Sequence, residues 1–342
     1  MQPHSRIHQL DLFRFCAAAL VVAFHYLTMG PLFGMYEAPF PDIVPAARYG
    51  FYGVPLFFLI SGFVIAMSAE GKTASEFLRA RFCRLFPVFW VACTITFVGV
   101  KLAGPVPFQT SVAGYLASMT MVLPHFLHTP YVDGVYWTLL PEWLFYFAVA
   151  ALLRFGHYDR YRATYLTIWL VVAMLLLKTK AGPLRTVTIA EYAPYFVAGA
   201  AFFDIYRGRA TRHDVYNVLF SFLVALQAAK LRISDVARDA GYRLNETVVF
   251  LIIAGLFGLF TLLACHKLER LNRRAFLPLG ALTYSFYLCH QNLGYAAISA
   301  LEGSVSLQLA TGVALVAAIT LAAVLHYGVE RPVHAFLAPA KK

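Results

Sequence analysis

Charged side chains are scarce in this sequence of 342 residues, and long polar stretches are missing. Asp, Glu, Lys and Arg make up 13% of the chain, whereas Ala, Val, Ile, Leu, Met, Phe, Trp, Tyr and Cys make up 60%. A soluble globular protein has about a quarter charged residues. Apolar runs of about twenty residues recur along the whole length instead. These absences exclude an ordinary soluble protein and predict a single membrane domain over residues 1–342.

Signals for disulfides and metals are also missing. The cysteines are odd in number and no two have the spacing of metal ligands, so we interpret them as small apolar side chains. His125 and His128 offer only two ligands in a predicted loop, too few for a site. The sequence therefore predicts neither a disulfide framework nor a bound metal. The five cysteines are Cys16, Cys83, Cys93, Cys265 and Cys289.

The net charge of +11 does not indicate nucleic acid. Polar segments lack a basic patch with interleaved aromatic residues, so we expect no nucleic-acid partner. The positive charges instead fall in short loops between apolar runs, as in membrane proteins. The first run, from His8 to Met29, lacks a small-residue cleavage site after a short apolar core. We therefore expect an uncleaved first helix rather than a signal peptide.

Hydropathy predicts an all-α polytopic membrane bundle of about ten transmembrane helices. Each apolar run has about 17 to 23 residues, which is enough to cross a hydrocarbon core of about 30 Å. The stretch 110–124 is apolar but too short, and it is typical of a re-entrant or interfacial segment. The ten predicted spans are residues 8–29, 50–69, 84–103, 137–155, 162–178, 189–206, 214–231, 246–266, 278–300 and 305–326.

The distribution of Lys and Arg predicts that both termini are cytoplasmic. With this orientation, 18 of the 28 Lys and Arg residues lie in inner segments and nine in outer segments. If residues 110–124 also crossed the membrane, every later loop would change side and the bias would be lost. The positive-inside tendency therefore favours ten spans, with residues 104–136 outside.

Three polar residues lie in or beside the first span, where a charge is costly to bury. His25 follows Arg14 by eleven positions, so at about 100° per residue the two lie within about 20° of each other on one face. Asp11 is suited to pair with Arg14 one turn away. One interpretation is an ion pair at a helix end and a hydrogen-bonded core histidine. The other is a functional path that carries a cation at one depth and an imidazole deeper in.

Further polar residues occur at the openings of the third and fourth spans. Arg81 and Arg84 lie three residues apart at a predicted cytoplasmic edge, where they are either positive-inside anchors or a fork-shaped clamp for phosphate. Glu142 lies several residues into an apolar stretch, and proton transfer is a role that suits such a carboxyl group. Trp137 and Tyr146 flank it, either as an interfacial aromatic belt or as flat faces for a ligand.

The ninth span contains Tyr287 and His290, which share a helix face at a spacing of three residues. Cys289 and His290 point about 100° apart, so a Cys–His dyad is not expected. The structural interpretation is a polar seam between packed helices. After the tenth span, the sequence Glu330-Arg331-Pro332 by itself indicates a helix end.

Six motifs then occur in one order along residues 6–332. These are Arg14 with His25 after ten residues, the stretch Gly50–Phe63, Arg81 and Arg84 before Pro87, Trp137-Thr-Leu with Glu142 and Tyr146, Tyr284–His290, and Glu330-Arg331-Pro332. Together they resemble acyltransferase family 3, the integral membrane O-acyltransferases. Its members typically acetylate sugars of lipopolysaccharide O-antigen, exopolysaccharide, peptidoglycan, Nod factor or macrolide antibiotics. Some members carry a fused soluble esterase-like domain, which we do not expect here.

The resemblance implies that Arg14, His25, Arg81, Arg84 and Glu142 belong to the active pathway. We expect the arginines to hold the phosphates of acetyl-CoA. We expect His25, together with Glu142, to act on the acceptor hydroxyl. No side chain stands out as a covalent nucleophile, which favours direct transfer.

Substrate contacts complete the expected site. For the acceptor, Trp137, Tyr146, Tyr287 and His290 are the expected contacts. The expected partners are an acyl-CoA donor, a carbohydrate that is free or lipid-linked, and membrane lipid, with the protein in the bacterial inner membrane. The alternative is a transporter or flippase of a lipid-linked sugar, because intramembrane charges are equally normal in a carrier. A non-catalytic scaffold is a third possibility, but it has no need of buried charges.

Overall fold

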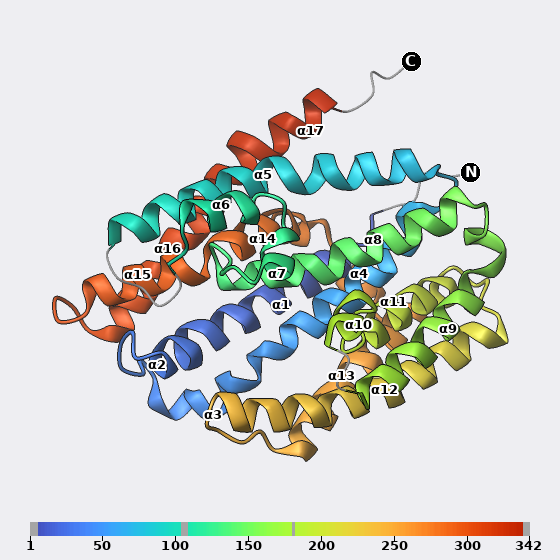
Figure 1. The fold of residues 1–342 in the computed structure, drawn as a ribbon, viewed down its shortest axis with the longest axis horizontal. Coiled ribbons are helices and arrows are strands. Elements are labelled where there is room, and N and C mark those ends of the chain that lie inside the picture. Colours follow the sequence, from blue (N-terminus) through green and yellow to red (C-terminus); the bar gives the residue numbers. More distant parts are fainter. Residues whose placement is uncertain (1–5, 104–108, 180–181, 338–342) are drawn as a thin grey trace. The chain divides into compact units, whose positions relative to one another are not determined.

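The computed structural model describes residues 6–103, 109–179 and 182–337 (Figure 1). Within those ranges the chain is helical and forms no β-strand, apart from an isolated bridge between Glu302 and Val305. The all-α prediction is therefore confirmed for the described residues. Lys180, Lys341 and Lys342, which entered the charge count, lie outside them. The orientation of the termini stays a prediction.

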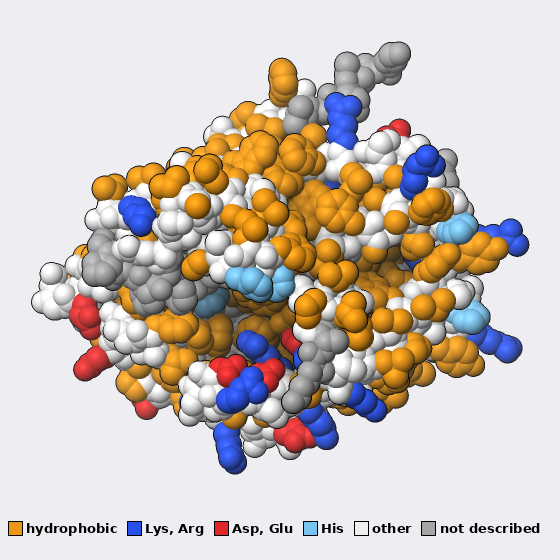
Figure 2. Space-filling view, viewed as in Figure 1, with side chains coloured by type: hydrophobic (Ala, Val, Ile, Leu, Met, Phe, Trp, Pro, Cys, Tyr) orange, Lys and Arg blue, Asp and Glu red, His pale blue; other side chains and the backbone are white. Residues whose placement is uncertain are grey.

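Eight helical segments in the described part of the chain are long and apolar enough to cross a membrane. Each overlaps one of the ten predicted spans. Figure 2 shows hydrophobic side chains over much of one face, with most charged side chains near its edges. The eight segments are His8–Leu32, Pro41–Ala69, Ala74–Ala103, Gly134–Arg154, Arg160–Leu177, Arg212–Asp239, Glu246–Ala264 and Leu307–Phe336.

The two remaining predicted spans are helical but have a different form. The span predicted at 189–206 is helix α11, Ala193–Tyr206, whose 14 residues rise only about 21 Å. The span predicted at 278–300 consists of α14, Leu277–Cys289, and α15, Gln291–Leu301, which are separated at His290. The helix does not end at Glu330-Arg331-Pro332, because a π-helical turn at His326–Glu330 continues into α17, Arg331–Leu337.

The segment predicted to be too short to cross does form only short helices. These are α6, Val112–Ser118, and α7, Leu123–Leu127. Ser111 caps α6, because its side chain accepts a hydrogen bond from the backbone N–H of Gly114. His128 ends α7 in the left-handed conformation, with φ of 52°.

The described helices group into two compact units, and neither is one continuous stretch of sequence. The first unit contains Met1–Ala17, Tyr52–Leu78 and Pro141–Leu277, and the second contains Ala18–Phe51, Arg79–Leu140 and Pro278–Lys342. Helices α1, His8–Phe24, α5, Ala74–Ala103, and α8, Leu139–Arg154, have residues in both. The prediction of a single domain stays a prediction.

The core of the first unit is the close contact between α11 and α4, Gly53–Ala69. A Cβ atom on Gly62 would lie 2.1 Å from the carbonyl oxygen of Phe196, and one on Gly199 would lie 2.2 Å from that of Leu59. The two glycines therefore allow the backbones to touch, as small residues do between membrane helices. The other helices of this unit are α9, Tyr158–Leu177, α10, Gly182–Val187, α12, Arg212–Asp239, and α13, Glu246–Ala264.

In the second unit α15 packs against α16, Leu307–Leu325. Alanines at a spacing of four form the buried stripe of α16. Gly294 on α15 leaves room for another side chain, since a Cβ atom there would lie 2.1 Å from the hydroxyl of Tyr26. The short helices α2, Gly30–Leu32, and α3, Val44–Ala47, also belong to this unit. The stripe consists of Ala310, Ala314, Ala318 and Ala322.

Candidate active site

His25 is the first residue of a π-helical turn, His25–Met29, that follows α1. Such turns are rare and occur frequently at functional sites. The imidazole of His25 is half-buried, and its Nδ1 lies 2.9 Å from Nε2 of His290. The two rings have centroids 5.0 Å apart. The structure thus pairs two of the predicted site residues, although 265 positions separate them.

His290 is fully buried at the break between α14 and α15. Its Nδ1 lies 2.9 Å from the backbone carbonyl oxygen of Tyr287. Its own carbonyl oxygen accepts a hydrogen bond of 2.8 Å from the hydroxyl of Tyr26. Both the ring and the backbone of His290 are therefore held by partners in the second unit.

These contacts determine which ring nitrogens carry protons. A carbonyl oxygen only accepts hydrogen bonds, so Nδ1 of His290 must donate to Tyr287, and in the neutral ring Nε2 is then an acceptor. Nδ1 of His25 must consequently be the donor to His290. The neutral His25 ring is left with its lone pair on Nε2, which is the form that a general base requires.

A buried carboxyl group holds the backbone beside His290. Asp133 accepts hydrogen bonds from the backbone N–H of Asn292, at 3.0 Å, and of Val135, at 3.1 Å. The side-chain amide of Asn292 donates in turn to the carbonyl oxygen of Val132, at 2.9 Å. Burial raises the pKa of Asp133 to about 7, against the opposing effect of the two N–H donors.

Asp133 and Asn292 were not predicted as site residues from the sequence. The sequence features that could have indicated them were an Asp four residues before Trp137 and an amide side chain two residues after His290. Neither pointed to the other, because the hydrogen bond joins positions 159 apart.

Of the predicted acceptor contacts in this unit, Tyr287 lies beside the histidine pair. Its ring centroid is 5.6 Å from that of His290, and its hydroxyl lies 3.2 Å from the hydroxyl of Thr138. Trp137 precedes Thr138 in the same short 3-10 helix, Gly134–Thr138, and is half-buried. The short helix that carries Trp137 is therefore in contact with Tyr287.

Arg81 and Arg84 lie on α5, three residues apart and half-buried. The residue after Arg84 is tied to α14, because the hydroxyl of Tyr284 donates to the carbonyl oxygen of Leu85 at 3.3 Å. The helix that carries the two arginines is thus connected to the helix that precedes His290. What the guanidinium groups bind stays a prediction.

In the first unit Glu142 is part of a three-residue hydrogen-bonded group. Its Oε1 accepts from the hydroxyl of Ser61 at 3.1 Å and from the hydroxyl of Tyr146. The ring of Tyr146 also packs against those of Phe77 and Trp143, with centroids 6.2 and 5.4 Å away. Tyr146 was predicted as a sugar contact, and its hydroxyl is here directed to the carboxylate. Ser61 was missed as a partner of Glu142, because nothing in the sequence links two helices 81 positions apart.

Arg14 is also in the first unit, where the predicted ion pair with Asp11 is present. Nη1 of Arg14 lies 3.6 Å from Oδ1 of Asp11. Asp11 makes shorter contacts with Arg6, whose guanidinium donates two hydrogen bonds of 2.9 Å. The interpretation of an ion-paired helix end is therefore borne out for Asp11. The role of Arg14 in catalysis stays a prediction, as does the orientation of His25 by Glu142.

Within residues 6–103, 109–179 and 182–337 no three His, Cys, Asp or Glu side chains gather in a way that could hold a metal ion. The arrangement instead offers proton transfer at an imidazole, cationic side chains and aromatic faces inside a bundle of membrane helices.

Comparison with known proteins identifies the class to which this arrangement belongs. The chain is a multi-pass membrane acyltransferase, since a family model described as an acyltransferase domain matches residues 7–327. It belongs to acyltransferase family 3. The chain is also similar to Nodulation protein 10 of Rhizobium leguminosarum bv. viciae, with 26% identity over 326 residues, which cover 84% of this chain and 83% of that protein. No solved structure matches it significantly.

Proposed function

We propose that this protein transfers an acetyl group from acetyl-CoA to a hydroxyl group of a cell-surface or secreted sugar, at the bacterial inner membrane. Membership of the acyltransferase family supports the transfer of an acyl group. The similarity to a nodulation protein supports a sugar as the acceptor. The observation that carries the proposal is the pairing of His25 with His290, because it leaves Nε2 of His25 as a base.

In the proposed reaction Nε2 of His25 takes the proton of the sugar hydroxyl while the oxygen attacks the thioester carbonyl carbon. A C–O bond forms, the C–S bond breaks, and the proton passes from His25 to the departing thiolate. The products are the acetylated sugar and free CoA, with no acyl-enzyme intermediate. General base catalysis of this kind contributes about 10² to 10⁴ in rate.

We propose that His290 is a positioning residue rather than a direct contact of the sugar, because both its ring nitrogens have partners. When His25 becomes an imidazolium, its Nδ1–H still donates to His290. Hydrogen bonds that involve a charged group are about twice as strong as neutral ones. The pair therefore stabilises the charge that develops on His25 during the transfer.

The remaining predicted residues are assigned by their chemistry. We propose that the phosphates of CoA are bound by Arg81, Arg84 and Arg14. A planar guanidinium suits this role because it can donate two hydrogen bonds to one phosphate group. The aromatic faces of Trp137 and Tyr287 suit a sugar ring, and we propose them as acceptor contacts. We propose that Tyr146 affects the transfer through Glu142, to which its hydroxyl donates a hydrogen bond.

The test combines acetyl-CoA with the purified full-length protein and a panel of exopolysaccharide oligosaccharides and lipid-linked sugars. Free thiol and the gain of one acetyl group by the sugar are measured together. A flippase of lipid-linked sugar would release no thiol, so that outcome would overturn the proposal.

Two substitutions at His25 test the base. His25→Ala and His25→Asn should both abolish transfer while the protein remains folded. A packing histidine predicts otherwise, because Asn retains a hydrogen bond. If His25→Asn keeps near-normal turnover at saturating substrates, His25 is structural. Glu142 then becomes the leading base, and Glu142→Gln should be the inactive variant.

A further inference from the structure

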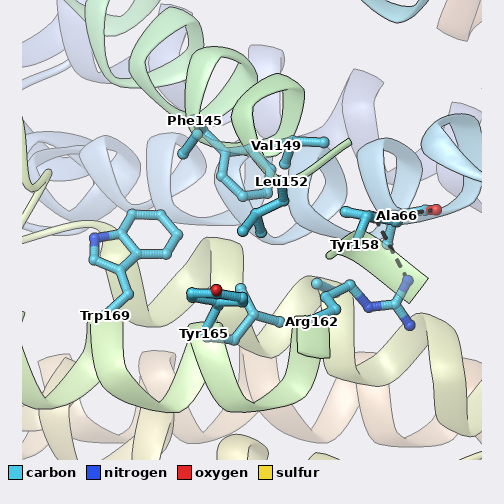
Figure 3. Close-up of a pocket in the computed structure, with 11 residues that line it drawn as sticks. Ala66, Phe145, Val149, Leu152, Tyr158, Arg162, Tyr165 and Trp169 are labelled. Atoms are coloured by element: carbon cyan, nitrogen blue, oxygen red, sulfur yellow. Dashed lines mark hydrogen bonds between the residues drawn. The ribbon is translucent and has the colours of Figure 1, made fainter. Parts of the chain in front are cut away.

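A groove between α8 and α9 in the first unit is lined almost wholly by apolar side chains (Figure 3). Among its described lining residues only Arg162 is charged, and it already pairs with Asp204 and donates to the hydroxyl of Tyr158. The groove therefore offers no uncommitted charge that would select a ligand. In the second unit, by contrast, the buried carboxyl group of Asp133 is committed to two separate helices.

Asp133 accepts one hydrogen bond from the start of each of these helices. Its Oδ1 accepts from the backbone N–H of Val135, 3.1 Å away, and so caps the 3-10 helix Gly134–Thr138. Its Oδ2 accepts from the backbone N–H of Asn292, 3.0 Å away, in the first turn of α15. The first N–H groups of a helix have no partner within the helix, so an oxygen that accepts from them stabilises that end. One carboxyl group thus caps two helices.

This double cap suits a carboxylate rather than an amide. Two N–H donors require an acceptor at each oxygen, and an ionised carboxylate accepts at both. The amide of Asn has one oxygen, and its NH2 group would face an N–H donor at the other position. Burial raises the pKa of Asp133, which precedes the candidate membrane span Gly134–Arg154, to about 7. The carboxylate is therefore the main form at pH 8.

The backbone beside Asp133 is itself held in place. The N–H of Val132 donates to the hydroxyl oxygen of Ser118 at 3.2 Å, and Ser118 is fully buried at the end of α6. The carbonyl oxygen of Val132 accepts from the side-chain amide of Asn292 at 2.9 Å. Two hydrogen bonds therefore connect Asn292 to consecutive residues of this segment, and the carboxylate is fixed relative to α15.

The two capped helices carry residues that the proposed reaction uses. His290 immediately precedes α15, two positions before Asn292. Trp137, a proposed acceptor contact, lies in the 3-10 helix that Asp133 caps. Because α14 and α15 are separate helices, the position of His290 depends on where α15 begins. The hydrogen bond from Asn292 to Asp133 fixes that beginning.

We propose that Asp133 is a positioning residue of the acetyl transfer, which holds His290 in place to accept from His25 by capping α15. Through its second oxygen it also holds the short helix that carries Trp137. This inference rests on the proposed function. Asp133 is assigned no contact with either substrate and no proton transfer, so its removal acts on kcat only through His290. The loss is therefore no larger than that caused by removing the His290 ring.

The kinetic test replaces Asp133 by Ala, which removes both caps, and measures the transfer at pH 8 and saturating acceptor. We expect kcat to fall by about five- to tenfold, with the KM for acetyl-CoA unchanged. In a His290→Leu background the same substitution should change kcat by less than about twofold, because the two residues act as a unit. Equal losses in both backgrounds would show a general structural role and overturn the proposal, as would full kcat in a folded Asp133→Ala protein.

Amide hydrogen exchange measures the two caps without relying on activity. In Asp133→Ala the N–H groups of Val135 and Asn292 should both exchange at least about tenfold faster than in the native protein. Asp133→Asn should preserve one cap, and its kinetics should follow the cap that is lost. Faster exchange at Asn292 should accompany a lower kcat, and faster exchange at Val135 a higher KM for the acceptor. Faster exchange at Asn292 with full kcat would refute the positioning of His290.

The matched control is Asp42→Ala, which removes an exposed carboxyl group from the same unit. It should leave both kcat and the exchange of Val135 and Asn292 unchanged. If Asp133→Ala fails to fold, Asp133→Asn is closer in shape and makes the same comparisons in both backgrounds. A native protein that transfers no acetyl group but shows the expected exchange would contradict the proposed function and leave the double cap standing. Unchanged exchange in Asp133→Ala would overturn the inference whatever the activity.

Discussion

Replacing His290 by Leu tests the histidine pair more directly than removing the base itself. Leu has a similar volume but cannot accept the Nδ1–H of His25 or donate to the carbonyl oxygen of Tyr287. His25 remains in place, so only its hydrogen-bonded partner is lost. The contrasting variant is His290→Gln, whose amide oxygen can still accept a hydrogen bond at that distance from the backbone.

The expected effect follows from the change of charge on His25. A hydrogen bond between neutral groups contributes about 0.5–1.5 kcal/mol, and one to a charged group about 1.5–3 kcal/mol. The difference, about 1–1.5 kcal/mol, is present only when His25 carries the proton. Its loss lowers kcat by about tenfold, and more if the ring then adopts the tautomer without a lone pair on Nε2. His290→Gln should stay within about fivefold of the native kcat.

The assay is acetyl transfer at saturating acceptor, with KM for acetyl-CoA measured beside kcat. Loss of an interaction made only in the transition state lowers kcat and leaves the KM for acetyl-CoA unchanged. In a His25→Asn background, His290→Leu should have no further effect on kcat, because the two residues act as a unit. Full kcat in a folded His290→Leu protein would refute the reasoning, as would equal and additive losses in both backgrounds.

Three further predictions concern the donor site, the buried carboxyl group and the topology. Arg84→Ala should weaken binding of acetyl-CoA by about 10- to 100-fold in a titration, and Arg84→Lys should restore only part of it; unchanged affinity would exclude the clamp. Asp133 has a pKa raised from 3.8 to about 7 in the folded protein, so the folded state binds its proton more tightly and loses stability as pH rises through that interval. The Tm of the native protein should therefore fall relative to that of Asp133→Asn between pH 4 and about 7, and a constant difference would contradict the assigned burial. In a protein without native cysteines, an impermeant reagent applied from outside should label Leu127→Cys, which is 57% exposed, and not Arg160→Cys; the reverse pattern would overturn the predicted orientation.

The spans could be predicted from the sequence because the bilayer imposes a length and a composition on each of them. The same criterion could not foresee the break between α14 and α15. Residues 278–300 are apolar throughout most of their length, and nothing local requires the helix to stop at Cys289. At the break the carbonyl oxygen of His290 accepts from the hydroxyl of Tyr26 as well as from the N–H of Gly294, and the N–H of Asn292 in the next helix donates to Asp133. Tyr26 and Asp133 come from distant parts of the chain.

The candidate site shows the same division between local and distant contacts. Glu142 and Tyr146 meet because residues four apart on a helix are neighbours, and the pair of Asp11 with Arg14 follows from a spacing of three. His25 and His290 were each singled out as polar residues in apolar spans. Their contact depends on how α15 packs beside the π-helical turn, which no spacing in the sequence encodes.

The contact between α4 and α11 has a consequence for the biogenesis of the protein. Helix α11 is too short to cross a full hydrocarbon core, and most of its side chains are buried against other helices rather than offered to lipid. We therefore expect the translocon to receive a weak insertion signal from this segment. We expect its entry into the membrane to depend on α4, which is made more than a hundred residues earlier and whose Gly62 leaves room for the backbone of α11. A larger residue at Gly62 should thus act first on membrane integration and the yield of intact protein.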